Sequence, residues 1–348
     1  MSRNASLHRW DASELASWSW SGVRETIDDH PRLNGHPMYN GGPHLVGSLR
    51  GPIVETDPFD EAIASWNAST PPGTWLELRL RASFARGRWT RWYSLGVWAE
   101  GTETIARHSV PGQRDEDADV ETDIVRLTAR AQAFQAELLL FSLAADVLPR
   151  AGSVTVLTSG GGAPRPFRAD RAAWGTVLDV PSRSQMLYPQ GGEAWCSPAS
   201  VAMVLAHFGF DVEVPAAAAG TYDWAYGGCG NWSFNVSFAG RFGLDAYVTR
   251  FASLADVERL VSERAPVVVS YGWEPGELDG APLERSGGHL GVVVGFDEKG
   301  DPVVNDPAAP RDEEVRRVYR RWQFERQWLV RSGGTAYVIR PREGGGSI

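Results

Sequence analysis

The sequence predicts two domains, an N-terminal all-β antiparallel sandwich followed by a C-terminal α+β domain. Between residues 52 and 157, apolar and polar residues alternate in short stretches separated by turn residues, which is typical of half-buried antiparallel strands. A glycine-rich segment at 160–164 predicts a linker. Beyond it, an apolar pattern of helical period begins at Cys196 and several strand-like segments follow. One helix preceding an antiparallel sheet favours the α+β class for the second domain.

The length of 348 residues is sufficient for two domains that each bury their own core. We expect a polar N-terminal arm over residues 1–50, the sandwich over 51–164 and the second domain over 165–348. Whether the arm covers a cleft of the second domain is left open by the sequence.

Charge and cysteine content exclude several classes of protein. The formal net charge is −9 and no Lys/Arg-rich run occurs, which argues against a nucleic-acid partner. No apolar run approaches the ~20 residues of a membrane span, and the first residues contain no apolar core of a signal peptide. We therefore expect a soluble chain, with secretion left open. Two cysteines, Cys196 and Cys229, form no disulfide framework and no zinc site, so we expect two free thiols, no metal and no cofactor.

The strands of the first domain are predicted from alternation. Leu76, Leu78 and Leu80 are each followed by a charged residue, so a strand with one buried face is expected there. A stretch rich in acidic side chains, 114–123, is expected to be a solvated loop, with a calcium site as the alternative. The predicted strands cover residues 76–81, 89–98, 125–130, 134–143 and 153–158.

The second domain is predicted to begin with a buried helix. Its apolar face consists of Val201, Val204, Leu205 and Phe208, and Gly209 is a suitable stop. A second helix is expected over 253–264, because Ser253 followed by Asp256 resembles a capping box. Residues 215–240 are expected to be rich in loops. The predicted strands cover 266–271, 289–296, 302–306 and 335–340.

Cys196 lies at the start of the predicted helix, directly after a Gly-Gly loop. Unpaired N–H groups and the positive end of the helix dipole favour a thiolate there. Gln190, six residues upstream, could place its side-chain amide beside the sulfur as an oxyanion donor. The alternative is a cysteine that only packs in the core. Together with the downstream partners described next, the pattern favours catalysis.

A thiolate nucleophile requires a histidine, and His289 is the better candidate. His207 lies eleven residues after Cys196 on the same helix, about 16 Å along the axis, which is too far. His289 instead follows Gly287-Gly288 and opens a valine-rich strand.

The orienting carboxylate is predicted from a hairpin. If the turn at 297–300 closes a regular hairpin, Phe296 faces Asp301 and His289 faces Ala308. Asp306 is then a diagonal neighbour of His289 on the same face of the sheet. Asn305 points to the opposite face, because side chains alternate along a strand. A surface hairpin with a turn-capping aspartate is the alternative.

These motifs resemble the C39-like cysteine peptidases, a branch of the papain-like fold, over about residues 180–340. The resemblance implies that Cys196 is the nucleophile, His289 the general base and acid, Asp306 the orienter and Gln190 the oxyanion-hole side chain. Known members that cleave leader peptides carry membrane segments and an ATPase. This chain has no Walker loop, so leader processing is not implied. The quoted motifs are Gln190, Trp195-Cys196-Ser197-Pro198, Gly288-His289, Asn305-Asp306-Pro307, 230–235 and 331–335.

The predicted function is that of a cysteine peptidase or amidase that hydrolyses a peptide or amide bond through a thioester. Trp195, Trp232 and Tyr271 are predicted to line its cleft, with a core position as the alternative for each. Cys229 is expected to be a bystander. Two other functions stay open: an acyl or peptidyl transferase with the same Cys-His-Asp machinery, and a catalytically inert protein that contacts a glycan or peptide through its sandwich.

Overall fold

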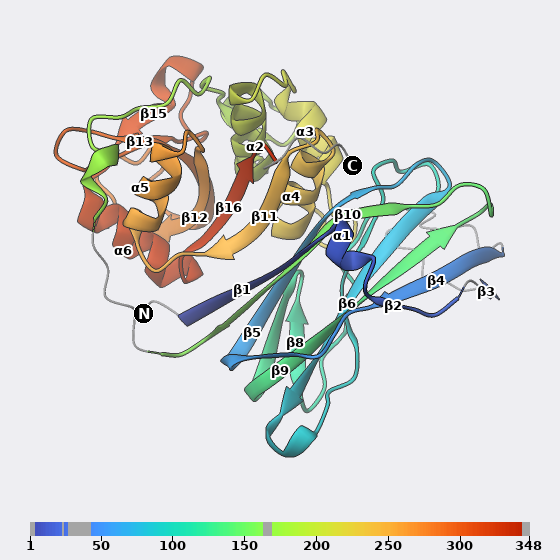
Figure 1. Cartoon of the computed structure of the whole chain (residues 1–348). Coiled ribbons are helices and arrows are strands. Elements are labelled where there is room, and N and C mark those ends of the chain that lie inside the picture. Colours follow the sequence, from blue (N-terminus) through green and yellow to red (C-terminus); the bar gives the residue numbers. More distant parts are fainter. Residues whose placement is uncertain (1–3, 23, 27–42, 163–168, 343–348) are drawn as a thin grey trace. The chain divides into compact units, whose positions relative to one another are not determined.

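The computed structural model of the chain describes residues 4–22, 24–26, 43–162 and 169–342 (Figure 1). Over this described part the chain is mostly β, with two sheets and six α-helices. The predicted boundary near residue 165 lies outside the described residues. No helix of the described part is long and apolar enough to cross a membrane.

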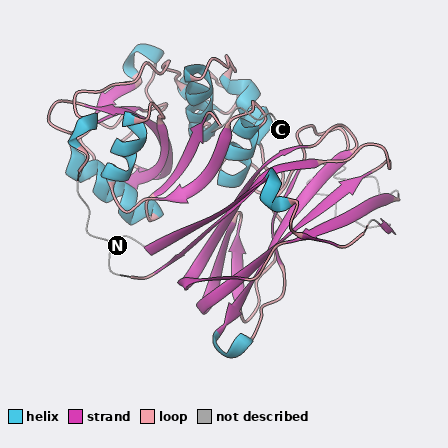
Figure 2. Cartoon of the chain, in the orientation of Figure 1, coloured by secondary structure: helices cyan, strands magenta, loops and turns pink. Residues whose placement is uncertain are grey.

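Residue contacts divide the chain into two compact units. Of the described residues, the N-terminal unit contains 6–160, with their gaps, and 222–241. The C-terminal unit contains 4–5, 161–162, 169–221 and 242–342. The domain ranges given above stay a prediction, as does the papain-like arrangement. Figure 2 shows that strands dominate the N-terminal unit and that helices and strands mix in the C-terminal unit.

The N-terminal unit contains a ten-stranded sheet, counted over the described residues. Its central strands are long and antiparallel, and their apolar side chains are buried in near-continuous runs. The helix α1 (Ala12–Leu15) is capped by Asp11, whose carboxylate accepts the N–H groups of Ser13 and Glu14. The main strand order is β1 (Asn4–Asp11), β10 (Arg150–Gly160), β5 (Val54–Ser69), β9 (Ile124–Ser142), β4 (His44–Arg50) and β2 (Ser19–Trp20). Four more strands pair outside this order. The strand β3 (Arg24–Thr26) pairs with β4, β6 (Thr74–Phe84) pairs with β7 (Tyr93–Trp98) and with β9, and β8 (Ala118–Glu121) pairs with β9.

Several details of this sheet differ from the sequence predictions. The strands expected at 125–130 and 134–143 are one strand, β9, and the strand expected from residue 89 begins at Tyr93. Part of the expected N-terminal arm forms β1, β2 and β4. These strands join the sheet through backbone pairing, which leaves little trace in a polar sequence. The acidic stretch contains β8, and Asp123 at its end is buried.

A helix from the second half of the sequence, α4 (Trp232–Gly240), belongs to the N-terminal unit. Phe234 packs edge-on against Trp66, and the hydroxyl groups of Ser233 and Ser237 donate to carbonyl groups of β5. Residues 215–240 were expected to be rich in loops, yet they hold α4 and most of α3 (Val214–Thr221). The reason is burial on nearly all sides of α4, which removes the amphipathic pattern that predicts a surface helix.

The C-terminal unit contains a six-stranded antiparallel sheet. The helix α2 (Cys196–His207) contacts β13 (Ser286–Phe296), and α6 (Arg321–Ser332) contacts β12 (Val267–Trp273). The helix α5 (Leu254–Ser262) begins after Ser253, whose hydroxyl caps it as predicted. The strand order is β11 (Asp245–Arg250), β16 (Thr335–Arg340), β12 (Val267–Trp273), β13 (Ser286–Phe296), β14 (Pro302–Asn305) and β15 (Arg316–Val318), orange to red in Figure 1.

The hairpin of β13 and β14 differs from the predicted register near its turn. Phe296 pairs with Pro302 rather than Asp301. A register shift between Val293 and Gly295 then compensates for this difference, and Val293 pairs with Val304. From the bulge onward the strands therefore follow the register that was predicted. The mistake at the turn does not reach the end of the hairpin where His289 lies.

Candidate active site

Cys196 is the first residue of α2. The next nine residues of the helix are buried, whereas Cys196 itself is partly exposed. Its sulfur accepts the backbone N–H groups of Ser197 and Leu290 and a hydrogen bond from the side chain of His289. The thiol thus lies at the start of a buried helix, where one N–H of the helix (Ser197) and one of β13 (Leu290) donate to the sulfur.

His289 lies on β13 between Cys196 and Asp306. Its Nε2 atom is 2.8 Å from Oδ1 of Asp306, so Nδ1 is the ring nitrogen available to Cys196. The imidazole is buried, and the rings of Tyr271 and Trp273 contact it edge-on at centroid distances of 5.3 and 5.6 Å. These contacts fix the plane of the ring. The three side chains predicted as nucleophile, base and orienter therefore form one hydrogen-bonded chain.

Asp306 directly follows β14 and has no exposed surface. Besides His289, its Oδ1 atom accepts the N–H of Ala308 at 3.1 Å. Its Oδ2 atom accepts the hydroxyl groups of Tyr271 and Tyr319, each at 2.7 Å. Sequence reasoning missed Tyr319, because it reaches the site only through the pairing of β14 with β15. Asn305, by contrast, accepts a hydrogen bond from Arg316 and donates to the carbonyl of Val180.

The electrostatics of the three side chains Cys196, His289 and Asp306 favour a thiolate–imidazolium pair. Burial by itself would raise the pKa of Cys196, but the hydrogen bond and charge of His289 lower it below the usual value. Burial by itself would lower the pKa of His289, but the charge of Asp306 raises it well above the usual value. Burial by itself would raise the pKa of Asp306, and the charge of His289 with the tyrosine hydroxyls lowers it instead. The charge of each of these three groups therefore stabilises the charge of its neighbour.

The loop before Cys196 is held by a glutamine that the sequence analysis did not identify. Gln185 is 2% exposed, and its side-chain amide donates to the carbonyl of Gly192 at 2.6 Å. A Cβ at Gly192 would lie 2.0 Å from the carbonyl oxygen of Gln185, so only glycine fits there. Gln190, the predicted oxyanion-hole residue, is exposed in the same loop. No pattern marks Gln185 over Gln190, because its contact depends on how the loop folds back.

The three residues predicted to line the cleft have different positions. Trp195 is partly exposed at the start of α2, with its indole against Gly191. Trp232 is partly exposed on α4, in the N-terminal unit. Tyr271 occupies the core position that was the alternative for it, because it is fully buried and its hydroxyl donates to Asp306.

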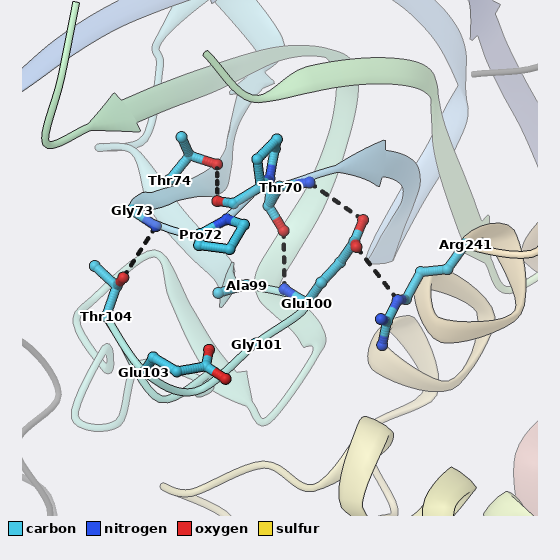
Figure 3. A pocket seen from close by; sticks show the side chains of 11 residues that line it. Thr70, Pro72, Gly73, Thr74, Ala99, Glu100, Gly101, Glu103, Thr104 and Arg241 are labelled. Carbon is cyan, nitrogen blue, oxygen red and sulfur yellow. Dashed lines mark hydrogen bonds and ion pairs between the residues drawn. The ribbon is translucent and has the colours of Figure 1, made fainter. Parts of the chain in front are cut away.

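The N-terminal unit contains a pocket of about 380 Å³ with walls that are polar and apolar in similar measure (Figure 3). Glu100 lies in its wall, where its carboxylate accepts the N–H of Thr70 and pairs with Arg241 at 3.4 Å. None of the predicted site residues lines this pocket.

Neither cysteine of the described part is in a disulfide, and Cys229 is buried. Over the residues that the structure describes, no three His, Cys, Asp or Glu side chains are grouped so that they could hold a metal ion.

Comparison with solved structures finds a Bacillus anthracis protein described as a C39-like peptidase, at 19% identity and a TM-score of 0.34. The match covers 48% of this chain and 98% of that one. A structure of the Gx strain of infectious bursal disease virus matches at 8% identity and a TM-score of 0.24, over 47% of this chain and 35% of that one. Both scores are low and carry no argument. A comparison with curated proteins finds no match.

Two family models match most of the chain. The model of the peptidase C39 N-terminal domain matches residues 7–159. The model of the peptidase C39-like family matches residues 177–336, which include Cys196, His289 and Asp306. The first match also identifies the N-terminal half, which resembled no known module on its motifs. By these two matches, the chain belongs to the C39-like peptidase family.

Proposed function

We propose that the chain is a cysteine peptidase or amidase that hydrolyses a peptide or amide bond through a thioester intermediate. Cys196 is the proposed nucleophile, His289 the general acid and base, and Asp306 the residue that orients His289. The observation that carries the proposal is the continuous hydrogen-bonded chain from the thiol through the imidazole to a buried carboxylate. This is the geometry that nucleophilic catalysis by cysteine requires.

In the first half-reaction, the Cys196 thiolate attacks the carbonyl carbon and a C–S bond forms as the π electrons move to oxygen. The backbone N–H of Cys196 and the side-chain amide of Gln190 are the proposed donors to that oxyanion. Because Nε2 of His289 is bonded to Asp306, Nδ1 gives its proton to the leaving amine. The C–N bond then breaks, and the acyl group remains as a thioester.

In the second half-reaction, water attacks the thioester and Nδ1 of His289 takes the proton. A second tetrahedral oxyanion forms and collapses, the C–S bond breaks, and the acid leaves. The thiolate is regenerated beside the imidazolium, so the enzyme returns to its starting charge state. An acyl transferase would differ only in using an amine in place of water. Neither that alternative nor glycan contact has a specific observation in its favour, so hydrolysis of a peptide or amide is proposed.

The test is the rate of iodoacetamide modification of Cys196 as a function of pH, followed by mass spectrometry. The pKa of Cys196 is lowered and that of His289 is raised. At pH values between these two pKa values, we therefore expect a thiolate at Cys196 paired with an imidazolium at His289. We expect modification well below the free-thiol pKa of ~8.5, and His289→Ala should move the profile toward that value. Buried Cys229 is the internal reference.

Peptidase activity is then measured on a mixture of peptides, with Cys196→Ala as the control that cannot form the thioester. Activity should fall as the pH drops through the pKa of Cys196 and again as it rises through that of His289. A Cys196 that titrates as a free thiol with or without His289 would refute the proposal and favour an inert binding protein.

A further inference from the structure

The carboxylate of Asp306 carries a complete set of hydrogen bonds that sequence and family do not account for. A carboxylate offers about four acceptor positions, two on each oxygen. Oδ1 accepts from His289 Nε2 and the Ala308 N–H, and Oδ2 accepts from the hydroxyl groups of Tyr271 and Tyr319. Asp306 has no exposed surface, so both oxygens are satisfied by protein donors alone.

We propose that Tyr271 and Tyr319 are positioning residues that act through Asp306, by holding its carboxylate ionised and aimed at His289. This proposal rests on the proposed function. With Oδ2 held by two hydroxyl groups, the carboxylate cannot rotate about its Cβ–Cγ bond without losing both bonds. Oδ1 therefore stays in line with Nε2 of His289.

The two tyrosines reach Asp306 from different elements. Tyr271 lies on β12, and Tyr319 lies between β15 and α6, where its N–H donates to the carbonyl of Pro302. Both rings pack against Phe324 of α6, at centroid distances of 4.9 and 5.5 Å. Ring packing and hydroxyl placement are therefore separable, because phenylalanine would keep the first and lose the second.

The backbone around the Tyr271 hydroxyl is shaped to admit it. A Cβ built on Gly291 of β13 would lie 2.9 Å from that hydroxyl and 3.2 Å from the carbonyl oxygen of Asn305. Only a glycine leaves the hydroxyl room at this point. The burial and the charge of Asp306 also raise the pKa of both tyrosines, so their hydroxyl groups remain protonated donors throughout the working range of pH.

Loss of these donors has a defined chemical consequence. Buried Oδ2 would keep a charge without partners, so the pKa of Asp306 would rise and the carboxylate would tend to be neutral. His289 would then lose the charge that stabilises its imidazolium, and Cys196 would lose the imidazolium that stabilises its thiolate. The effect appears at the sulfur, about three hydrogen bonds away from the change.

The experiment compares Tyr271→Phe, Tyr319→Phe and the double variant in the full chain, measuring the pH profile of Cys196 alkylation. Each single variant should shift the acid limb upward by about one pH unit, a roughly ten-fold loss of rate at acid pH, and the double variant by more. The matched control is Tyr93→Phe. Tyr93 is also fully buried and donates to an aspartate at 2.7 Å, but it lies in the N-terminal unit.

A second comparison asks whether the tyrosines act through Asp306. In a chain that already carries Asp306→Ala, adding Tyr271→Phe should not change the alkylation profile further. Folded single variants with the wild-type profile, or a tyrosine effect that persists undiminished without Asp306, would overturn the inference. If the double variant does not fold, the single variants decide. Failure of the proposed function would be distinguishable, because wild-type Cys196 would then titrate as a free thiol.

Discussion

Replacing Asp123 by asparagine should remove a pH-dependent loss of stability from the N-terminal unit. The Asp123 carboxylate is 3% exposed and accepts the N–H groups of Trp232 and Ser233, at 2.6 and 3.2 Å, at the start of α4. Burial first, and then the charge of Asp223, raise its pKa to about 7, against which these two hydrogen bonds act. An asparagine oxygen can accept the same N–H groups and does not ionise.

The magnitude follows from the two pKa values. A folded-state pKa of about 7 against 3.8 for the unfolded carboxyl gives (7 − 3.8) × 1.36, or about 4 kcal/mol. Because the folded pKa is raised, this stability is present in full below about pH 3.8 and is lost as the pH rises to about 7. Roughly 2–3 kcal/mol of the loss falls between about pH 5 and about pH 8.

The assay is hydrogen exchange of the α4 amides in the full chain, with rates corrected for the intrinsic effect of pH. The difference in opening free energy between wild type and Asp123→Asn should change by about 2–3 kcal/mol across that pH interval. Asp119→Asn, which alters a partly exposed carboxylate of the same acidic stretch, is the matched control and should show little change. A difference between wild type and Asp123→Asn that stays the same at both pH values would refute the reasoning.

Two further predictions concern the candidate site. Gly291→Ala should displace the Tyr271 hydroxyl, because the added Cβ would lie 2.9 Å from it. Alkylation of Cys196 at acid pH should then slow by roughly ten-fold, as it would if the hydroxyl were removed. A folded variant whose pH profile of Cys196 alkylation is unchanged would contradict this. Gln185→Ala should leave the buried carbonyl of Gly192 without its side-chain donor and lower the free energy of unfolding by about 1–3 kcal/mol, measured by thermal or urea unfolding. A stability equal to that of the wild type would show that the loop does not depend on this bond.

The sequence predicts this fold best where one face of an element is buried and the other is not. Period-two alternation located β6, and the apolar face with its glycine stop located α2. Prediction from the sequence failed for α4, whose residues are nearly all buried. It also failed for edge strands such as β1, whose polar residues are held by backbone pairing. The long strand β9 was divided in two because it has different neighbours along its length.

The predicted contact of His289 with Asp306 was obtained from a register that is wrong at the turn. The bulge after Val293 restores the expected pairing toward the end of the hairpin, and no feature of the sequence indicates that bulge. Tyr319 and Gln185 could not have been found in this way. Tyr319 reaches Asp306 because β15, which the sequence analysis did not predict, pairs with β14. Gln185 reaches the carbonyl of Gly192 because the loop before Cys196 folds back on itself.

The assignment of α4 to the N-terminal unit has a consequence for how the protein is synthesised and how it can be divided. The chain enters the C-terminal unit after Gly160, leaves it after Thr221 for one helix, and returns at Phe242. On the ribosome, the N-terminal unit therefore cannot be completed until more than a third of the C-terminal unit's sequence has been made. A fragment cut at the glycine-rich linker would likewise separate α4 from β5 and expose Phe234 and its apolar neighbours. Such a fragment is expected to aggregate, so the two units must be studied in one polypeptide.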